Sequence, residues 1–119
     1  YLKAEQFRRL LIEDFQAVFE DVDAIITPTT PLTAWKHDEK KVKVGSDQES
    51  VLAASWRLTY PFNLTGFPAI SIPAGFDKNS LPIGLQIVAK PFDESMVLRV
   101  AKAYEKCHDW VTEKPSLTT

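Results

Sequence analysis

The chain has 119 residues, of which 45% are hydrophobic and 25% charged, a composition typical of a single globular domain. Its net charge of −2 excludes the strongly basic character of proteins that bind nucleic acid or anionic membranes. No apolar run approaches the roughly 20 residues that span a bilayer, so no membrane partner is expected.

The single cysteine, Cys107, cannot form a disulfide within the chain, so a cytoplasmic location is expected. The sequence begins at Tyr1, without a methionine, and is at once in a helical pattern. We therefore expect residues 1–119 to be part of a longer polypeptide.

The first expected element is a helix over residues 1–20. Apolar residues recur there at helical spacing, and no glycine or proline interrupts them. The expected apolar stripe consists of Phe7, Leu10, Leu11, Phe15, Val18, Phe19 and Val22. The apolar run 24–26 is too short for a helix and predicts a buried strand, which ends at Thr27-Pro28.

Residues 27–45 are expected to form loops, first an ordered one rich in threonine and proline and then a charged, solvated one. The sequence Ser46-Asp47-Gln48-Glu49 matches a capping box, in which the first and last side chains bond to each other's backbone. It predicts a helix that runs through Trp56 and is ended by Pro61.

The second half of the chain predicts two strands and a helix. The apolar segments 69–72 and 84–89 flank the turn residues 77–80, which favours an antiparallel pair. Asp93 is expected to cap the last helix. The buried stripe of that helix is expected to be Val97, Val100, Ala101, Tyr104, Cys107 and Val111.

The expected order α-β-α-β-β-α gives an α/β fold with only three strands. So few elements leave the edges and one face of the sheet uncovered. This again favours a fragment, and exposed strand edges could also allow dimers to form.

The segment FNLTGFPAISIPAGF, residues 62–76, interrupts a strand-like run with two glycines and two prolines. Glycine removes the steric penalty of crowded or left-handed backbone, and proline fixes φ. We expect a short strand that is held rigidly at both ends, with its backbone close to another group.

The common catalytic motifs are absent from the sequence. No serine is followed three positions later by lysine, and no Gly-x-Ser-x-Gly, phosphate-binding loop or His-Glu-x-x-His occurs. His37 is interpreted as a solvated loop residue, Cys107 as a small core residue and His108 as a helix-end residue. No catalytic residue, metal site or cofactor is therefore expected.

Four polar or aromatic residues leave alternatives open. Trp56 and Tyr60 share a helical face, so they could fill the core or form an aromatic wall to a pocket. Asn63 could cap a turn or face that pocket. Ser71 could satisfy backbone groups within its strand or reach a cleft.

The stretch WRLTYPFNLTGFPAISIPAGFDKNSLPIGLQIVAKPFDESMVLRVAKAYE, residues 56–105, resembles the C-terminal part of the amidase signature family. The resemblance rests on the Tyr-Pro-Phe-Asn lead-in, then Gly-x-Pro-Ala-x-Ser-x-Pro-x-Gly, Leu-Pro-x-Gly-Leu-Gln and a final helix, in that order. The upstream segment VDAIITPTTPLTA, residues 22–34, resembles the preceding strand and Thr-Pro loop of the family.

The resemblance implies that residues 1–119 are the C-terminal fragment of a single amidase domain with an α/β/α fold and a mixed sheet. Family members hydrolyse amides with a lysine, a bridging serine and a nucleophilic serine, all from N-terminal regions that this sequence does not contain. None of these residues can be carried over, so the chain is expected to be inactive alone.

The remaining implied role is support for the cleft of a small-molecule amide substrate, without a cofactor. The candidate wall residues are Thr29, Pro31, Trp56, Tyr60 and Asn63. Gly66 and Gly75 would permit close backbone approach, while Pro68 and Pro73 would stiffen the ends of the strand.

Within the family, the amidase component of the tRNA-dependent amidotransferase commonly has an acidic residue where this chain has Trp56. The aromatic residue favours a stand-alone amidase that acts on a less polar amide. A glutamine-hydrolysing amidotransferase component is the alternative, and a non-catalytic module that binds a partner through its sheet is a third.

Overall fold

The computed structural model describes residues 1–114, except the side chain of Val111. The helices are α1 (Leu2–Asp21), α2 (Val51–Trp56), α3 (Tyr60–Thr65), α4 (Glu94–Cys107) and the 3-10 turn η1 (Trp110–Thr112). The strands are β1 (Ala24–Pro28), β2 (Lys41–Val44), β3 (Asp47–Ser50), β4 (Ala69–Phe76) and β5 (Pro82–Ala89). Within this part of the chain, no helix is both long and apolar enough to cross a membrane.

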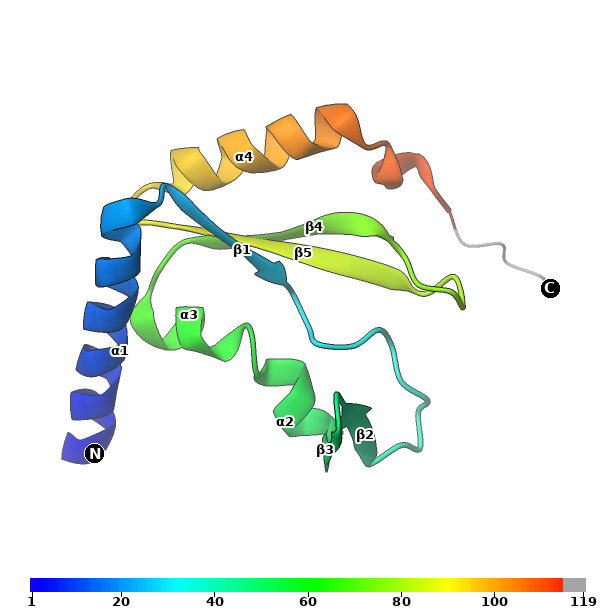
Figure 1. The fold of residues 1–119 in the computed structure, drawn as a ribbon, viewed down its shortest axis with the longest axis horizontal. Coiled ribbons are helices and arrows are strands. Elements are labelled where there is room, and N and C mark those ends of the chain that lie inside the picture. The colour runs from blue at the N-terminus through cyan, green and yellow to red at the C-terminus, as the bar shows by residue number, and fades with distance from the viewer. Residues whose placement is uncertain (115–119) are drawn as a thin grey trace.

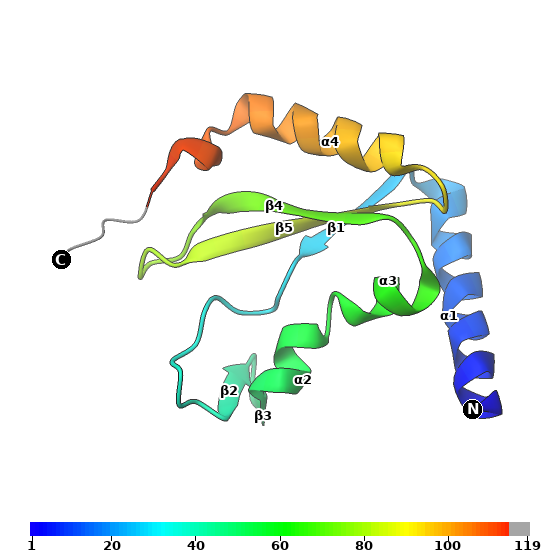
Figure 2. The same cartoon turned by 180° about the vertical axis from the view of Figure 1, so that it is seen from behind.

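A three-stranded sheet with the order β1-β5-β4 forms the centre of the fold. Both strand pairs are antiparallel, as expected for the pair that the sequence identified. Figure 1 shows α4 along one face of the sheet and α3 on the other, with α1 beside the end of the sheet. This arrangement confirms the expected α/β class, with helices on both faces, and Figure 2 shows it from behind.

Alternate residues of β5 supply the core on the two faces, because side chains in a strand point to opposite faces in turn. Val88 packs with Phe19 of α1 and with Phe62 and Phe67 on one face. Ile87 packs with Ile72 of β4 and Ala101 of α4 on the other. Both β5 residues are fully buried, so β5 is the central strand of the fold and is covered on both faces.

Strand β2 lies in the charged segment that was expected to be a solvated loop, and β3 occupies the expected capping box that begins at Ser46, so both predictions are wrong. Valine alternates with lysine along β2, which gives one half-buried and one exposed face. Gly45 makes the turn with φ of +61°. The residue that caps α2 is Ser50, whose hydroxyl accepts a hydrogen bond from the Ala53 N–H at 3.1 Å.

The sequence predicted one helix from residue 46 that Pro61 would end. This prediction is wrong. The chain forms two short helices, and Pro61 lies in the first turn of α3, where its missing N–H would have no partner within the helix. Gly66 ends α3 with φ of +79°, and its N–H donates to the Phe62 carbonyl at 2.8 Å. A Cβ at Gly66 would meet nothing within 4 Å, so its backbone conformation, not close approach, requires glycine.

Strand β4 is longer than expected. It begins directly after Pro68, but Pro73 lies inside it, opposite Gly84, and not at its end. A proline is tolerated there because β4 is an edge strand of this sheet. Gly75, with φ of +117°, lies at an irregularity in the register and packs under the Trp110 ring.

Asp93 caps α4 as expected, since its carboxylate accepts a hydrogen bond from the Met96 N–H at 3.1 Å. Val97 and Ala101 are buried, but Cys107 is exposed, so its assignment to the buried stripe is wrong. The helix ends at Cys107, which leaves residue 111 in η1.

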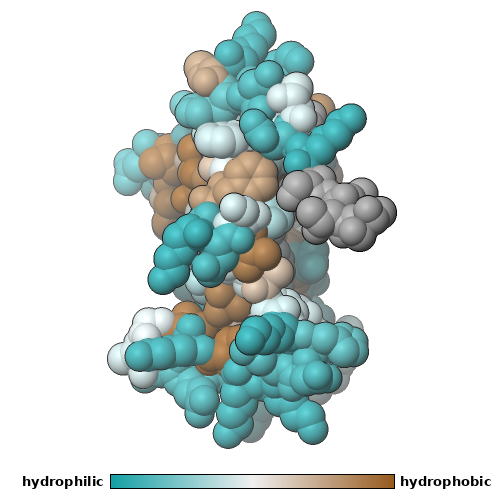
Figure 3. Space-filling model, turned by 90° about the vertical axis from the view of Figure 1, so that its right-hand side faces the viewer, coloured by the Kyte–Doolittle hydropathy of each residue, from teal (hydrophilic) through white to brown (hydrophobic). Residues whose placement is uncertain are grey.

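Helix α1 is only partly covered by the rest of the chain. Phe19 is buried, whereas Phe7, Leu10 and Val18 from the same expected stripe are exposed. Other apolar groups are also uncovered. Figure 3 shows brown apolar side chains across the middle of the side that carries the β4–β5 turn, between hydrophilic bands.

Candidate functional site

One face of the sheet changes from apolar to polar along β5. Val88 belongs to the core on this face, whereas Gln86 and Gly84, two and four positions before it, border polar groups. The neighbouring strands supply Thr27 from β1 and Ser71 from β4, each directly opposite Gln86. The polar residues therefore lie on one sheet face because they share the two-residue period of the strands.

Thr29 and Ser71 meet above Gly84. The Thr29 N–H donates to the Gly84 carbonyl at 2.8 Å, which extends the β1–β5 ladder past the end of β1. The hydroxyls of Thr29 and Ser71 are 2.6 Å apart, a hydrogen bond between segments 42 positions apart in sequence. A Cβ at Gly84 would lie 2.6 Å from Thr29 Oγ1 and 3.0 Å from Ser71 Oγ, so the hydroxyl pair needs glycine beneath it.

Gln86 of β5 connects β1 and the link between α2 and α3 on the same face of the sheet. Its side chain is buried, with 4% exposed, and its Nε2 donates to Thr27 Oγ1 at 3.0 Å and to the Leu58 carbonyl at 2.9 Å. A buried amide requires such partners, because an unpaired polar group in the interior is costly. Gln86 thereby holds the link between α2 and α3 against the sheet.

These groups border a cavity of about 320 Å³ between the sheet and α3. Its polar lining consists of Thr29, Thr59, Asn63, Ser71 and Gln86. Phe62 and Phe67 form part of its apolar wall. We refer to it as the hydroxyl–amide cavity.

Of the five wall residues expected from the sequence, Thr29 and Asn63 line this cavity. Pro31 lines a neighbouring cavity of about 210 Å³ along the Thr-Pro loop, which Gly84 also borders. Trp56 and Tyr60 stack on each other with ring centroids 6.4 Å apart. They are 50% and 58% exposed, so they do not fill the core within this chain, and neither lines the hydroxyl–amide cavity.

Sequence reasoning did not identify Gln86, and it left the role of Ser71 open. The signal that could have found them is a polar residue in each of two otherwise apolar strands, within ISIP and GLQIVA. A polar side chain in a buried strand is retained only with hydrogen-bond partners.

The Thr-Pro loop is also tied to the β4–β5 turn. Asp77 accepts hydrogen bonds from the N–H groups of Leu81 and Asn79 and from the Thr33 hydroxyl. The Leu81 bond, followed by that from Thr33, lowers the pKa of Asp77 below 3.8, its ordinary value. The carboxylate is therefore charged at neutral pH and fixes the loop that carries Thr29 and Pro31.

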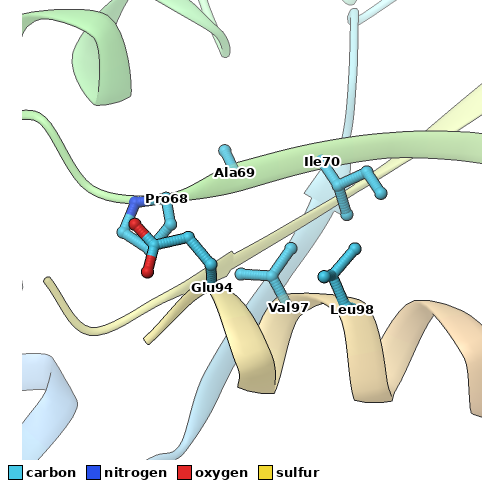
Figure 4. A pocket seen from close by; sticks show the side chains of 6 residues that line it. All are labelled: Pro68, Ala69, Ile70, Glu94, Val97 and Leu98. Carbon is cyan, nitrogen blue, oxygen red and sulfur yellow. The ribbon is translucent and has the colours of Figure 1, made fainter. Parts of the chain in front are cut away.

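A second cavity of about 380 Å³ lies on the opposite face, along the free edge of β4. Figure 4 shows Val97 and Leu98 of α4 pointing toward β4, with Glu94 beside Pro68. Its lining is otherwise apolar, with Ala69 and Ile70. It suits the packing of apolar groups better than bond cleavage.

Among the described residues that line the hydroxyl–amide cavity, none is an acid or a base that could activate a hydroxyl group. The Ser71 hydroxyl is paired with a threonine, and the thiol of Cys107 is exposed on α4. No group of three or more His, Cys, Asp or Glu residues in this part of the chain could hold a metal ion. The arrangement can bind and orient a polar molecule, but it does not supply the attacking group.

The comparisons with known proteins agree with the motifs. The family model described as Amidase matches residues 1–98. The chain is 50% identical over 117 residues to the A component of the glutamyl-tRNA(Gln) amidotransferase of Halalkalibacterium halodurans. That alignment covers 98% of this chain and 23% of the relative, so the chain spans about a quarter of the relative's length.

Two solved structures show the same fold. A crystal structure of an amidase superposes with a TM-score of 0.85 and 28% identity, over 90% of this chain and 24% of the other. The A component of the glutamyl-tRNA(Gln) amidotransferase of Thermotoga maritima superposes with a TM-score of 0.69 and 39% identity, over 87% of this chain and 22% of the other. The sequence motifs, the family match and the shared fold together show that this chain belongs to the amidase signature family.

Proposed function

We propose that this chain is the C-terminal part of a longer amidase, in which it forms one wall of the substrate cleft. The full enzyme would hydrolyse a carboxylic amide to a carboxylate and ammonia or an amine. Support comes from the family match and from the curated relative, of which the chain covers only 23%. A cytoplasmic location and a small-molecule substrate belong to the same proposal.

The observation that carries the proposal is the hydroxyl–amide cavity. It combines hydrogen-bonding groups from the Thr-Pro loop, α3, β4 and β5 around a space large enough for a small ligand. A wall that binds without reacting fits an enzyme whose nucleophile comes from another part of the same protein.

The chain's own residues would act by binding and orientation. Thr29 and Asn63 would contact the substrate, because both line the cavity. Pro31 would shape the neighbouring part of the cleft, and the exposed Trp56–Tyr60 stack would offer an aromatic surface to the rest of the protein. Holding an amide in place before attack lowers the barrier by removing the entropy cost of encounter.

The lysine and the two serines that the family uses would come from the remainder of the protein. The nucleophilic serine would attack the amide carbonyl, release ammonia or an amine, and leave an acyl-enzyme that water hydrolyses. These steps involve no residue of this chain as acid, base or nucleophile.

The test is to assay the full-length protein and residues 1–119 alone on simple aliphatic and aryl amides. The full-length protein should release ammonia or amine, and the isolated chain should not. Turnover by the isolated chain, or its absence from the full-length protein, would refute the proposal.

The second candidate is the amidase component of a tRNA-dependent amidotransferase, which would release ammonia from glutamine. It is favoured by the 50% identity to a protein of that name. Two measurements distinguish it: hydrolysis of L-glutamine by the full-length protein, and co-purification with a second protein of the amidotransferase. If the full-length protein is monomeric and ignores glutamine, this candidate is excluded.

A further inference from the structure

We propose that Arg8 of α1 is a positioning residue, whose hydrogen bond to the last turn of α3 holds Asn63 at the hydroxyl–amide cavity. This inference rests on the proposed function, in which Asn63 contacts the substrate. Arg8 does not line the cavity itself, so it would act through α3.

Helix α3 depends on other parts of the chain for its placement. It has only six residues, and isolated helices shorter than about 12 residues are marginal in water. No side chain caps its N-terminus. Asn63, which is exposed and lines the cavity, lies within this helix and moves with it.

Two backbone carbonyls, one at each end of α3, are bound by side chains from other elements. Just before the helix, the Leu58 carbonyl accepts a hydrogen bond from Gln86 Nε2 at 2.9 Å. In the last turn, the Leu64 carbonyl accepts one from Arg8 Nε at 2.7 Å, and Figure 1 shows this end of α3 next to α1. Carbonyls in the last turn have no partner within a helix, so Arg8 satisfies a group that α3 cannot satisfy itself.

The charge of Arg8 favours this contact. A hydrogen bond from a charged donor is stronger than one between neutral groups, and a cation is favourable at the C-terminal end of a helix. Glu5, one turn earlier in α1, also pairs with the guanidinium, with 3.6 Å between Arg8 Nη1 and its carboxylate. Because Leu64 directly follows Asn63, the bond fixes the backbone beside the residue that would contact the substrate.

The aromatic contact between α1 and α3 does not replace the Arg8 bond. Phe15 packs on Phe62 with ring centroids 5.1 Å apart. This apolar contact is non-directional, and it lies about two turns from Arg8 along α1. It holds the two helices together, whereas the directional bond from Arg8 sets the rotation of the last turn of α3.

The test is steady-state kinetics of the full-length protein with butyramide as the probe. Arg8→Met keeps an unbranched stem but removes the donor. It should raise KM by about tenfold, because a misplacement of about 1 Å can cost up to about 100-fold, and should leave kcat nearly unchanged. A smaller folded fraction would instead lower kcat and leave KM unchanged. An unchanged KM in Arg8→Met would overturn the inference.

Arg9→Met is the matched control. Arg9 is the next residue of α1, is 82% exposed and pairs with Glu13 of the same helix. Its loss should leave KM unchanged. A rise in KM equal to that of Arg8→Met would show that any charge lost from α1 has this effect, and would overturn the assignment.

A double variant tests whether Arg8 acts through Asn63. In the Asn63→Ala background the side chain to be positioned is gone, so Arg8→Met should change KM by less than about twofold. An equal rise in KM in both backgrounds would show that Arg8 acts by another route.

If the full-length protein hydrolyses no simple amide, the proposed function fails, and hydrogen exchange then decides on Arg8. The amides of α3 should exchange about three to ten times faster in Arg8→Met than in the wild type, whereas those of β5 should not change. Unchanged exchange in α3, or an equal increase in β5, would overturn the inference.

Discussion

Gly84 is the residue on which the shape of the hydroxyl–amide cavity depends most closely. Its φ does not lie in the left-handed region, so its backbone would accept other residues. The requirement is steric, because Thr29 and Ser71 close over it from opposite sides of β5. Contacts of 2.6 and 3.0 Å to an added Cβ force a shift in packed groups.

Gly84→Ala should therefore lower the free energy of unfolding by about 1–3 kcal/mol, the usual cost of overpacking, and should reduce amide turnover. Chemical denaturation and steady-state kinetics of the full-length protein measure the two effects. In the double variant with Thr29→Ala, the lost hydroxyl should relieve part of the clash, so the two stability losses should not add. Strict additivity would show that the hydroxyl contact is not the cause.

At the residue scale, sequence motifs pointed to two of the residues that line the hydroxyl–amide cavity. Thr29 and Asn63 came from the Thr-Pro loop and the Tyr-Pro-Phe-Asn lead-in, and both line the cavity. The partners of Gln86 could not be predicted, because Thr27 and the Leu58 carbonyl lie 59 and 28 positions away. Such a network depends on strand register, which no local pattern states.

At the scale of elements, the start of α2 was placed four residues too early. Ser46 begins a motif that matches a capping box, but Lys41–Val44 alternates like a strand, and a hairpin through Gly45 uses residues 46–50. In the hairpin, Lys41–Val44 and Asp47–Ser50 pair along their full length. The capping-box motif and the strand alternation favour different structures for these residues, and the pairing of two strands determines which one forms.

Ser50→Ala should weaken α2, because the Ala53 N–H loses its side-chain partner. The expected loss is about 0.5–2 kcal/mol, measured as faster amide hydrogen exchange within α2 of the full-length protein. Ser46→Ala is the matched control and should leave exchange in α2 unchanged, since Ser46 makes only a 3.4 Å contact with its neighbour Asp47. Faster exchange in α2 for Ser46→Ala, with no change for Ser50→Ala, would show that Ser46 and not Ser50 caps the helix.

The β4–β5 turn should depend on pH through Asp77. Hydrogen bonds from Leu81, Thr33 and Asn79 lower its pKa in the folded state below the ordinary value of 3.8. Folding therefore gains stability from the carboxylate above that value and loses it as the pH falls through the lowered folded-state pKa. Comparison with Asp77→Asn removes the contribution of other acids.

The stability advantage of wild type over Asp77→Asn should be constant near neutral pH and should diminish below about pH 4. Urea denaturation of both full-length proteins from about pH 3 to 7 measures it. An advantage that grows as the pH falls would contradict the ionised, hydrogen-bonded carboxylate.

At the scale of the whole molecule, the order of the three sheet strands and of the first and last helices was predictable, but the extent of burial was not. Periodicity identifies the apolar face of α1, yet it cannot tell which part of that face this chain covers. Phe15 and Phe19 pack on Phe67, whereas Phe7 and Leu10 are 61% and 59% exposed. Among residues 1–114, β1 and β4 each pair only with β5, so both outer edges of the sheet are also open.

The fragment proposal predicts what covers this surface: the remainder of a protein about four times as long, since the chain spans 23% of its curated relative. Leu10→Ala should then lower the unfolding free energy of the full-length protein by about 2–5 kcal/mol, the cost of a core cavity, although Leu10 is exposed in this chain. Gln16→Ala, an exposed position elsewhere on α1, should change it by less than about 0.5 kcal/mol.

The alternative is a self-sufficient module that dimerises through its open edges or through α1. In that case residues 1–119 alone would sediment as a stable dimer, and Leu10→Ala would act as strongly on the isolated chain as on the full-length protein. If instead the chain needs its missing neighbour, the isolated chain should associate non-specifically and bind a hydrophobic dye, because large apolar surfaces without a partner promote aggregation. A small effect of Leu10→Ala in the full-length protein would show that the rest of the polypeptide does not pack on α1.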